Sequence, residues 1–414
     1  MPRQGDPPDA DRELIDTGAS NGGMPALASP PRRARPLRAV VCGTTFGQVY
    51  LEAFRGPDAG FELAGVLAQG SARSRACAAA YGVPLFTDPA QLGDDVDAAC
   101  VVVRSGFLGG RGTELARALL ARGIHVLQEH PVHHDELAAC LREARRRGVV
   151  YQLNSFYVHL EPVRRFLAAG RELLARQAPL WVDASCGFQV GYALLDILGA
   201  ALGTVSPWRF ADPVQPPVQP PAGGGPPAFR SLDGAIGGVP VTLRVQNQLD
   251  ASDPDNFAHL LHRVTLGTEG GNLMLVSTHG PILWSARPRI PRGVRDPSGR
   301  PLFREEAFEG EAAATSRVLG PAAAASHRTI FTSLWPEGVR AALAGLRRAI
   351  LERTDPLERG QYHLALCRMW QEVAARLGPP DLVRLAVPAA LSVDDLAAVE
   401  RAAGALGTAA EPAG

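Results

Sequence analysis

The fold class is decided by the stretch Ala39-Val40-Val41-Cys42-Gly43-Thr44-Thr45-Phe46-Gly47. Its first four residues are apolar and predict a buried strand. A glycine-bearing turn then leads into helical spacing from Gln48 to about Phe54. The same alternation of apolar strand and amphipathic helix continues to about residue 153. Strict alternation at this spacing predicts α/β architecture, with a parallel, doubly wound Rossmann sheet.

Residues 38–153 form this predicted NADP-binding Rossmann domain. We expect its strands at 39–42, 63–68, 84–86, 98–103, 124–127 and 149–153, and its helices at 48–54, 72–81, 113–121 and 135–147. Residues 1–37 are rich in Pro, Arg, Asp, Gly and Ser and have almost no apolar periodicity. They are therefore predicted to be a disordered leader.

From residue 154 the pattern changes to consecutive strands joined by turn residues such as Glu269-Gly270-Gly271-Asn272. This pattern predicts an α+β domain with a largely antiparallel sheet over 154–378, interrupted by a proline-rich surface loop at 211–227. The expected elements are a helix at 162–177, strands at 180–185, 239–249, 260–267, 272–278 and 282–285, and closing helices at 338–353 and 357–377. Residues 379–414 are a C-terminal extension.

Composition excludes several classes of function. The formal net charge of zero argues against binding to nucleic acid. The sequence has no lysine, so this chain cannot form a Schiff base or use a lysine general acid. Its 6 cysteines lack C-x-x-C spacing. They are predicted to be small core residues of a protein in a reducing compartment. Without a transmembrane-length run or a signal peptide, we expect a soluble cytoplasmic protein with no membrane partner.

The turn after the first strand is a candidate phosphate-binding loop, made of Gly43, Thr44, Thr45, Phe46 and Gly47. Backbone amides in such a turn cradle a pyrophosphate. However, only two glycines of the G-x-G-x-x-G pattern are present, so a plain strand–helix turn is an open alternative. The threonine hydroxyls could replace the missing glycine contacts by donating to phosphate.

The end of the second strand favours NADPH over NADH. An NAD site usually has a carboxylate there for the ribose 2′-hydroxyl. This chain has none, but offers Ser71, Arg73 and Arg75, which suit a 2′-phosphate. The alternative is that the two arginines belong to a solvated helix face.

Titratable groups follow two further strands, at the edge where open α/β sheets bind ligands. Glu129 and His130 follow the run 124–127, and Tyr157 and His159 follow 149–153. Ordinary packing with a satisfied polar tip is the alternative for Tyr157 and His159. We also considered a metal at His130, His133 and His134, but no further ligand falls at suitable spacing, so no metal site is predicted.

The element order, the Glu129-His130-Pro131 turn and the second domain resemble the glucose–fructose oxidoreductase/inositol dehydrogenase/MocA family. That family carries Glu-Lys-Pro at this turn. Its Asp-x-x-x-His motif is half kept, because Asp196 is present and Ala200 stands at the histidine position. Without that lysine and histidine, the usual sugar-alcohol oxidation cannot run in the usual way.

A narrower resemblance, over about residues 38–378, is to the thiazolinyl imine reductases. It rests on the stretches 41–48, 64–71, 127–131, 154–159, 194–199, 246–256 and 278–281. This resemblance implies NADPH-dependent reduction of a thiazoline C=N to a thiazolidine. The substrate would be tethered to a nonribosomal peptide synthetase carrier domain during siderophore assembly of the pyochelin or yersiniabactin type. A homodimer is also expected.

By the same resemblance, Tyr157 and His130 occupy the positions proposed for proton delivery. We assign Tyr157 as general acid, His130 as its partner or alternate, and Glu129 as a residue that orients the nicotinamide end of the cofactor. Two alternatives stay open: a sugar or polyol oxidoreductase of the same fold, and a non-catalytic NADP-binding sensor.

Overall fold

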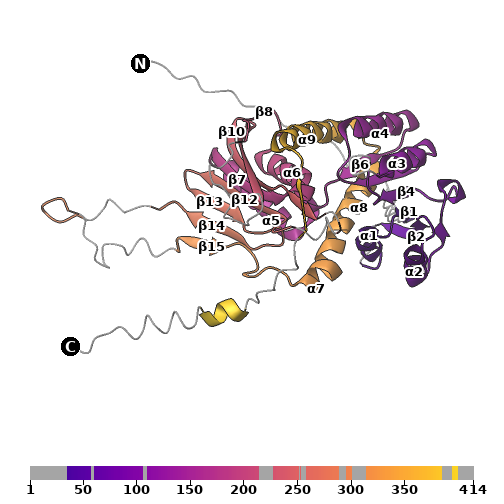
Figure 1. Cartoon of the computed structure of the whole chain (residues 1–414), viewed down its shortest axis with the longest axis horizontal. Coiled ribbons are helices and arrows are strands. Elements are labelled where there is room, and N and C mark those ends of the chain that lie inside the picture. The colour runs from indigo at the N-terminus through magenta and orange to yellow at the C-terminus, as the bar shows by residue number, and fades with distance from the viewer. Residues whose placement is uncertain are drawn as a thin grey trace, which may run out of the picture. The chain divides into compact units, whose positions relative to one another are not determined.

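The computed structural model describes residues 35–56, 60–105, 110–213, 227–250, 252, 258–288, 295–300, 314–384 and 394–399. Three predicted segments fall largely outside this set: the leader 1–37, the proline-rich loop 211–227 and the C-terminal extension 379–414. The described chain beyond residue 35 holds two large sheets joined by shared helices (Figure 1) and a third, two-stranded sheet.

The first sheet is parallel throughout and has the strand order β3-β2-β1-β4-β5-β6. Its strands are β1 (Leu37–Cys42), β2 (Phe61–Leu67), β3 (Leu85–Phe86), β4 (Ala98–Val101), β5 (His125–Glu129) and β6 (Tyr151–Asn154). The apolar runs of β1 and β4 are fully buried, as expected for strands covered on both faces. This sheet confirms the predicted doubly wound fold, and its strand order reverses between β1 and β4, where such folds bind ligands.

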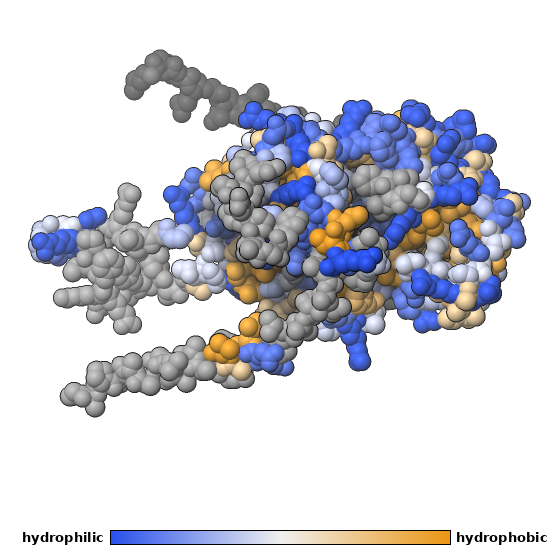
Figure 2. Space-filling model, in the orientation of Figure 1, coloured by the Kyte–Doolittle hydropathy of each residue, from blue (hydrophilic) through white to orange (hydrophobic). Residues whose placement is uncertain are grey.

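Four helices connect these strands: α1 (Gly47–Ala53), α2 (Ala72–Tyr81), α3 (Gly112–Ala121) and α4 (His134–Arg147). Ser71 caps the start of α2, and His133 forms a capping box with Glu136 at the start of α4. Both helices end at a left-handed glycine. On the face drawn in Figure 2, the region of α3 and α4 is mostly hydrophilic, in keeping with their amphipathic sequences.

The second sheet has eight strands in the order β15-β14-β13-β12-β7-β10-β9-β8. They are β7 (Pro179–Gly187), β8 (Trp208–Phe210), β9 (Phe229–Ile236), β10 (Val239–Gln246), β12 (His262–Thr268), β13 (Gly271–Leu275), β14 (Ile282–Ala286) and β15 (Ser316–Val318). All neighbouring pairs are antiparallel except β7 and β10. The largely antiparallel α+β domain is therefore confirmed.

Helices α5 (Glu161–Leu174) and α6 (Gly191–Leu202) cover one face of this sheet. Along β7 the side chains alternate between that buried face and an opposite, more exposed face that bears Trp181 and Asp183. Helix α6 is buried on almost every side, because it lies between the sheet and α9. Alternation along the strands thus places the core of the domain under α5 and α6.

The C-terminal helices pack against elements of both large sheet domains. After α7 (His327–Thr329), a π-helical turn at Ile330–Leu334 leads into α8 (Trp335–Glu352). Helix α8 packs against α1, and α9 (Pro356–Leu377) packs against both α4 and α6. Strand β16 (Asp381–Val383) pairs with β11 (Gln248–Asp250). In the described part of the chain, no helix is both long and apolar enough to cross a membrane.

Asn247 breaks the strand predicted at 239–249 into β10 and β11. Its side-chain amide donates to the Gly378 and Pro379 carbonyls, at 3.3 and 3.1 Å, just past the end of α9. The break is therefore set by a contact about 130 residues away in the chain, which strand periodicity alone does not reveal.

Candidate functional site

The turn after β1 lies tight against β4. Gly43 has φ +97°, and a Cβ there would sit 2.5 Å from the Val102 carbonyl oxygen, so only glycine fits. Gly47 opens α1 close to the Val41 side chain. Thr44 is buried beneath the turn, whereas Thr45 is exposed. Glycine at position 43 thus lets the turn lie against the residues that follow β4, a close approach that is typical of dinucleotide-binding turns.

The start of α2 reaches this turn through Arg73. The Arg73 Nη1 lies 3.4 Å from Thr45 Oγ1, a long contact between two exposed side chains. The Ser71 Oγ accepts the Ser74 amide at 3.2 Å, and Arg75 donates to the Gly70 carbonyl. The structure therefore brings together the two groups of residues predicted to hold a nicotinamide dinucleotide, and their chemistry fits that cofactor.

Glu129, at the end of β5, is held by protein groups. Tyr50 of α1 donates its hydroxyl to the Glu129 carboxylate. The Asn154 side-chain amide lies 2.6 Å from the Tyr50 hydroxyl and 3.3 Å from Glu129 Oε2. Burial and the Glu129 charge raise the pKa of Tyr50 well above its ordinary range, so the phenol stays protonated and remains a donor.

His130 follows directly and is nearly buried, with a side chain 6% exposed. Its Nδ1 lies 3.1 Å from Glu129 Oε1 and 3.1 Å from the Asn154 carbonyl oxygen. Both neighbours accept hydrogen bonds, so we assign the Nδ1 proton to this position. The Nε2 atom is then the nitrogen that can exchange a proton with a substrate. The ring stacks on Tyr192 of α6 with centroids 5.7 Å apart.

Tyr157 begins a short 3-10 turn, Tyr157–His159, just after β6. Its ring lies 6.1 Å from the His130 ring and 4.6 Å from the His262 ring, edge to face with both. The preceding Phe156 has φ 63° and ψ −59°, an unfavourable conformation for a bulky residue that is typical of functional turns. The structure therefore brings Tyr157 and His130 together, in what we call the strand-end site: Glu129, His130, Tyr157, Tyr192 and His262.

His262 lies at the start of β12, within the strand predicted at 260–267. It is fully buried, its Nδ1 lies 3.0 Å from Thr278 Oγ1 and its Nε2 lies 3.2 Å from the Val190 carbonyl. Burial lowers its pKa to about 3, so the ring is neutral near pH 7. Sequence reasoning missed its contact with Tyr157, because nothing in the local pattern links β12 to the end of β6.

Asp196 of α6 is buried behind the strand-end site. Its carboxylate accepts the Ser155 hydroxyl and the Tyr362 hydroxyl, the latter at 2.6 Å. The Tyr192 hydroxyl lies 2.9 Å from His363 Nδ1. The retained half of the Asp-x-x-x-His motif is therefore part of a buried polar network between α6 and α9. Tyr192, which stacks on His130, was not predicted.

An aromatic cluster of Phe46, Phe156 and Trp335 links the candidate cofactor loop to the second domain. Phe46 lies 5.4 Å from Phe156 and 5.6 Å from Trp335, measured between ring centroids. The Trp335 indole N–H donates to His279 Nε2 at 3.0 Å. Partial burial lowers the pKa of His279 to about 4, which keeps this ring neutral as an acceptor.

The histidines considered as metal ligands have other partners. His133 caps α4 and its Nε2 lies 2.8 Å from the Gln371 amide, whereas His134 contacts Asp135 and Arg368. Among the described residues, no three His, Cys, Asp or Glu side chains gather as metal ligands would.

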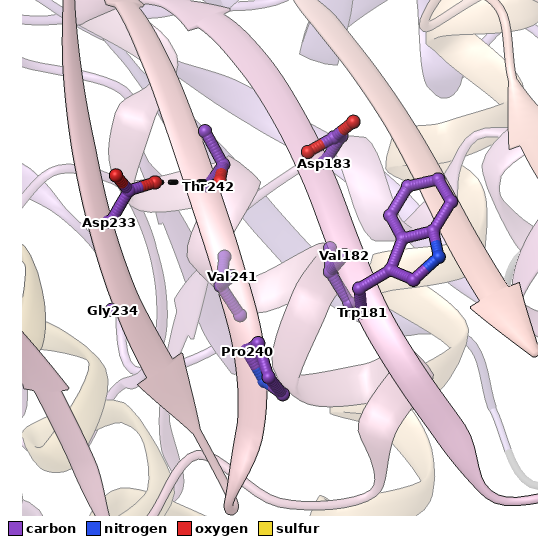
Figure 3. A pocket seen from close by; sticks show the side chains of 8 residues that line it. All are labelled: Trp181, Val182, Asp183, Asp233, Gly234, Pro240, Val241 and Thr242. Atoms are coloured by element: carbon purple, nitrogen blue, oxygen red, sulfur yellow. Dashed lines mark hydrogen bonds between the residues drawn. The ribbon is translucent and has the colours of Figure 1, made fainter.

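Two hollows lie away from His130 and Tyr157. The larger, about 410 Å³, is on the exposed face of the second sheet, between Trp181 and Asp183 of β7 and Asp233 of β9 (Figure 3). The Asp233 carboxylate there accepts the Thr242 hydroxyl at 2.7 Å. The smaller, about 240 Å³, lies at the start of α5. The expected homodimer stays a prediction.

Comparison with protein families gives two matches. Residues 37–155 match the oxidoreductase family with an NAD-binding Rossmann fold, and residues 177–285 match the C-terminal domain of Irp3-like thiazolinyl imine reductases. A search of curated proteins finds no match to the chain.

Solved structures share the fold at low sequence identity. The 3-ketoreductase KijD10 from Actinomadura kijaniata, in complex with NADP, is 16% identical, with a TM-score of 0.57 over 84% of this chain and 100% of its own. The UDP-N-acetylglucosamine 3-dehydrogenase GnnA from Acidithiobacillus ferrooxidans is 14% identical, with a TM-score of 0.55 over 82% of this chain and 97% of its own. At such identities the likeness shows the fold alone.

Proposed function

We propose that this chain reduces a thiazoline C=N to a thiazolidine. It belongs to the Rossmann-fold oxidoreductases and carries an Irp3-like thiazolinyl imine reductase C-terminal domain. The substrate is tethered to a nonribosomal peptide synthetase carrier domain during siderophore assembly. The observation that carries the proposal is the pairing of His130 with Tyr157, 6.1 Å apart between ring centroids, in a chain without lysine.

The cofactor in this proposal is NADPH. The turn Gly43–Gly47 would hold the pyrophosphate, and Ser71, Arg73 and Arg75 would hold the ribose phosphate. Arginine is suited to a phosphate because its planar guanidinium can donate two parallel hydrogen bonds. The contact between Arg73 and Thr45 supports this assignment, since it places a guanidinium beside the phosphate-binding turn. When bound, the reduced nicotinamide supplies hydride for the imine carbon.

The thiazoline nitrogen must gain a proton as the carbon is reduced. Tyr157 and His130 are the groups of the strand-end site that can deliver it. Glu129 and the Asn154 carbonyl keep a proton on His130 Nδ1, so the donor from this ring is protonated Nε2. The neutral His262 ring packs against the Tyr157 ring, and Tyr157 donates the proton through its hydroxyl. We assign Tyr157 as the general acid, with His130 as its partner.

NADPH consumption with a synthetic thiazoline thioester tests this function. We expect turnover with the wild-type protein and none with free polyols. Tyr157→Phe and His130→Ala should each lower kcat by about 100-fold, a typical contribution of general acid catalysis, and leave NADPH affinity intact. Near-wild-type turnover in both variants would refute the assignment of the acid. Turnover of polyols would instead favour a sugar-type oxidoreductase, and NADPH binding without any turnover would favour a sensor.

A further inference from the structure

The 240 Å³ cavity at the start of α5 combines an apolar wall with one cationic group. Its wall includes three prolines, Pro162, Pro281 and Pro321, and further aliphatic side chains. The polar side chains that line it are Glu161, Arg165 and His279. A pocket of this composition suits a ligand that is mostly apolar but carries one anionic group.

Arg165 is only partly neutralised. Its Nη2 donates to the Glu161 carboxylate, but its Nη1 is buried without a hydrogen-bond partner among the residues that the structure describes. Gly320, with φ +100°, makes room for it, because a Cβ there would lie 1.4 Å from Nη1. A guanidinium N–H without an acceptor is unfavourable, so Arg165, which lines the cavity, has hydrogen-bonding capacity left for an anionic group.

The start of α5 adds to the positive potential of this cavity. Its N-cap residue, Leu160, provides no side-chain acceptor for the first backbone amides of the helix. Since Glu161, Pro162 and Arg165 line the cavity, the positive end of the helix dipole lies at the cavity, with Glu161 as the acidic residue of the first turn that opposes it. These groups together favour an anion such as a phosphodiester over a neutral ligand.

Side-chain contacts connect one wall of the cavity to the strand-end site. His279 lines the cavity and accepts a hydrogen bond from Trp335, whose ring packs against Phe156, next to Tyr157. Thr278, the neighbour of His279, holds the buried ring of His262. A ligand in the cavity would thus contact His279, which is linked to Tyr157, the proposed acid, through Trp335 and Phe156.

We propose that this cavity binds the phosphopantetheine arm of the carrier domain, with Arg165 as the ligand of its phosphodiester. This proposal rests on the proposed function, because the carrier-bound substrate of that reaction brings such an arm. The apolar wall faces the dimethyl and methylene part of the arm, and the thioester end leads toward the strand-end site. Arg165 is then a substrate-binding residue outside the reacting centre.

The test compares two substrates that differ only in the phosphate: a thiazoline thioester of phosphopantetheine and the same thioester of pantetheine. We expect wild-type kcat/KM to be higher for the phosphorylated substrate by about 10-fold or more, as one charge-assisted hydrogen bond provides. Arg165→Ala should abolish this preference, mainly through KM, and Glu161→Gln should increase it. Retention of the preference in Arg165→Ala, or its absence from the wild type, would overturn the proposal.

Arg176→Ala is the matched control, since Arg176 pairs with Glu172 at the same i,i+4 spacing but does not line the cavity. It should keep the phosphate preference of the wild type. Calorimetry with phosphopantetheine alone separates the two proposals, because it requires no turnover. Binding that is lost in Arg165→Ala would support the site even if neither thioester were reduced, an outcome that would refute only the proposed reaction. No binding to the wild type would overturn the site.

Discussion

The Nδ1 atom of His130 lies 3.1 Å from Oε1 of Glu129, so this largely buried carboxylate fixes the orientation of the histidine. The pair is formed by consecutive residues at the end of β5. It is also supported from α1, because Tyr50 donates to the same carboxylate. The structure shows Glu129 in contact with His130, Tyr50 and Asn154, and its expected role in orienting the nicotinamide stays a prediction.

Glu129→Gln should therefore impair proton delivery. The amide can present its N–H to His130 Nδ1 and so disturb the tautomer that the carboxylate favours. We expect kcat to fall by about 10- to 100-fold, within the range of general acid catalysis, with an unchanged Kd for NADPH. Glu114→Gln, which removes an exposed carboxylate paired with Arg111, is the control. Equal kcat for Glu129→Gln and the wild type would show that the pair is not needed.

Arg73→Ala should weaken NADPH binding more than NADH binding. The guanidinium beside Thr45 would interact with the 2′-phosphate, which NADH lacks. We expect the Kd for NADPH to rise by about 10-fold or more, as for the loss of a charge-assisted hydrogen bond, with little change for NADH. Arg55→Ala, in which the lost side chain stacks over Tyr81, should leave the ratio of the two Kd values unaltered. An equal rise of the Kd values for NADPH and NADH in Arg73→Ala would contradict the NADPH assignment.

Gln189→Leu should stabilise the protein. In the described structure, neither Oε1 nor Nε2 of Gln189 has a hydrogen-bond partner, although both are buried. Burying an unsatisfied polar group is unfavourable by about 1–3 kcal/mol, and an apolar side chain of similar shape avoids this. We expect the free energy of unfolding in urea to increase by about 1 kcal/mol.

The control for that variant is Gln177→Leu. The Gln177 Oε1 accepts the Gly270 amide at 2.8 Å, so its loss should lower stability by about 1 kcal/mol. A decrease of similar size in both variants would mean that the Gln189 amide is satisfied in solution.

His262 should make the protein less stable in acid. Burial lowers its pKa from 6.5 to about 3, so the unfolded chain binds this proton more tightly than the folded chain. The contribution to stability is therefore complete above about pH 6.5 and is lost progressively as the pH falls toward 3. Each pH unit in this window should lower the free energy of unfolding by roughly 1 kcal/mol.

Urea unfolding at several pH values checks this prediction. The dependence on pH should be weaker in His262→Gln than in the wild type, whatever the absolute stability of the variant. A variant with the same slope as the wild type would show that His262 is not the group that takes up the proton.

Local patterns predicted the Rossmann half closely. The helix predicted at 135–147 is α4 (His134–Arg147), and the strand at 63–68 is β2 (Phe61–Leu67). These elements are set by neighbouring residues: apolar runs, caps and glycine stops. Strand β9 (Phe229–Ile236) was not predicted, because its burial depends on pairing with β8 and β10 and its own alternation is weak.

The candidate site was only partly predictable for the same reason. His130 and Tyr157 could be found because each follows an apolar strand, and parallel strands end at one edge. Tyr192 and His262 come from α6 and β12 and reach His130 and Tyr157 through tertiary packing alone. No spacing in the sequence relates them to the strand ends, so their part in the site required the structure.

The most direct test of the proposed imine reduction is deuterium transfer from NADPH that is deuterated at both C4 positions of the nicotinamide. After reaction with a synthetic thiazoline thioester, mass spectrometry should find a thiazolidine that carries a single deuterium on the former imine carbon. Imine reduction would be contradicted if the protein bound NADPH but left all of the thiazoline unreduced, and if it reduced NADP⁺ with a free polyol.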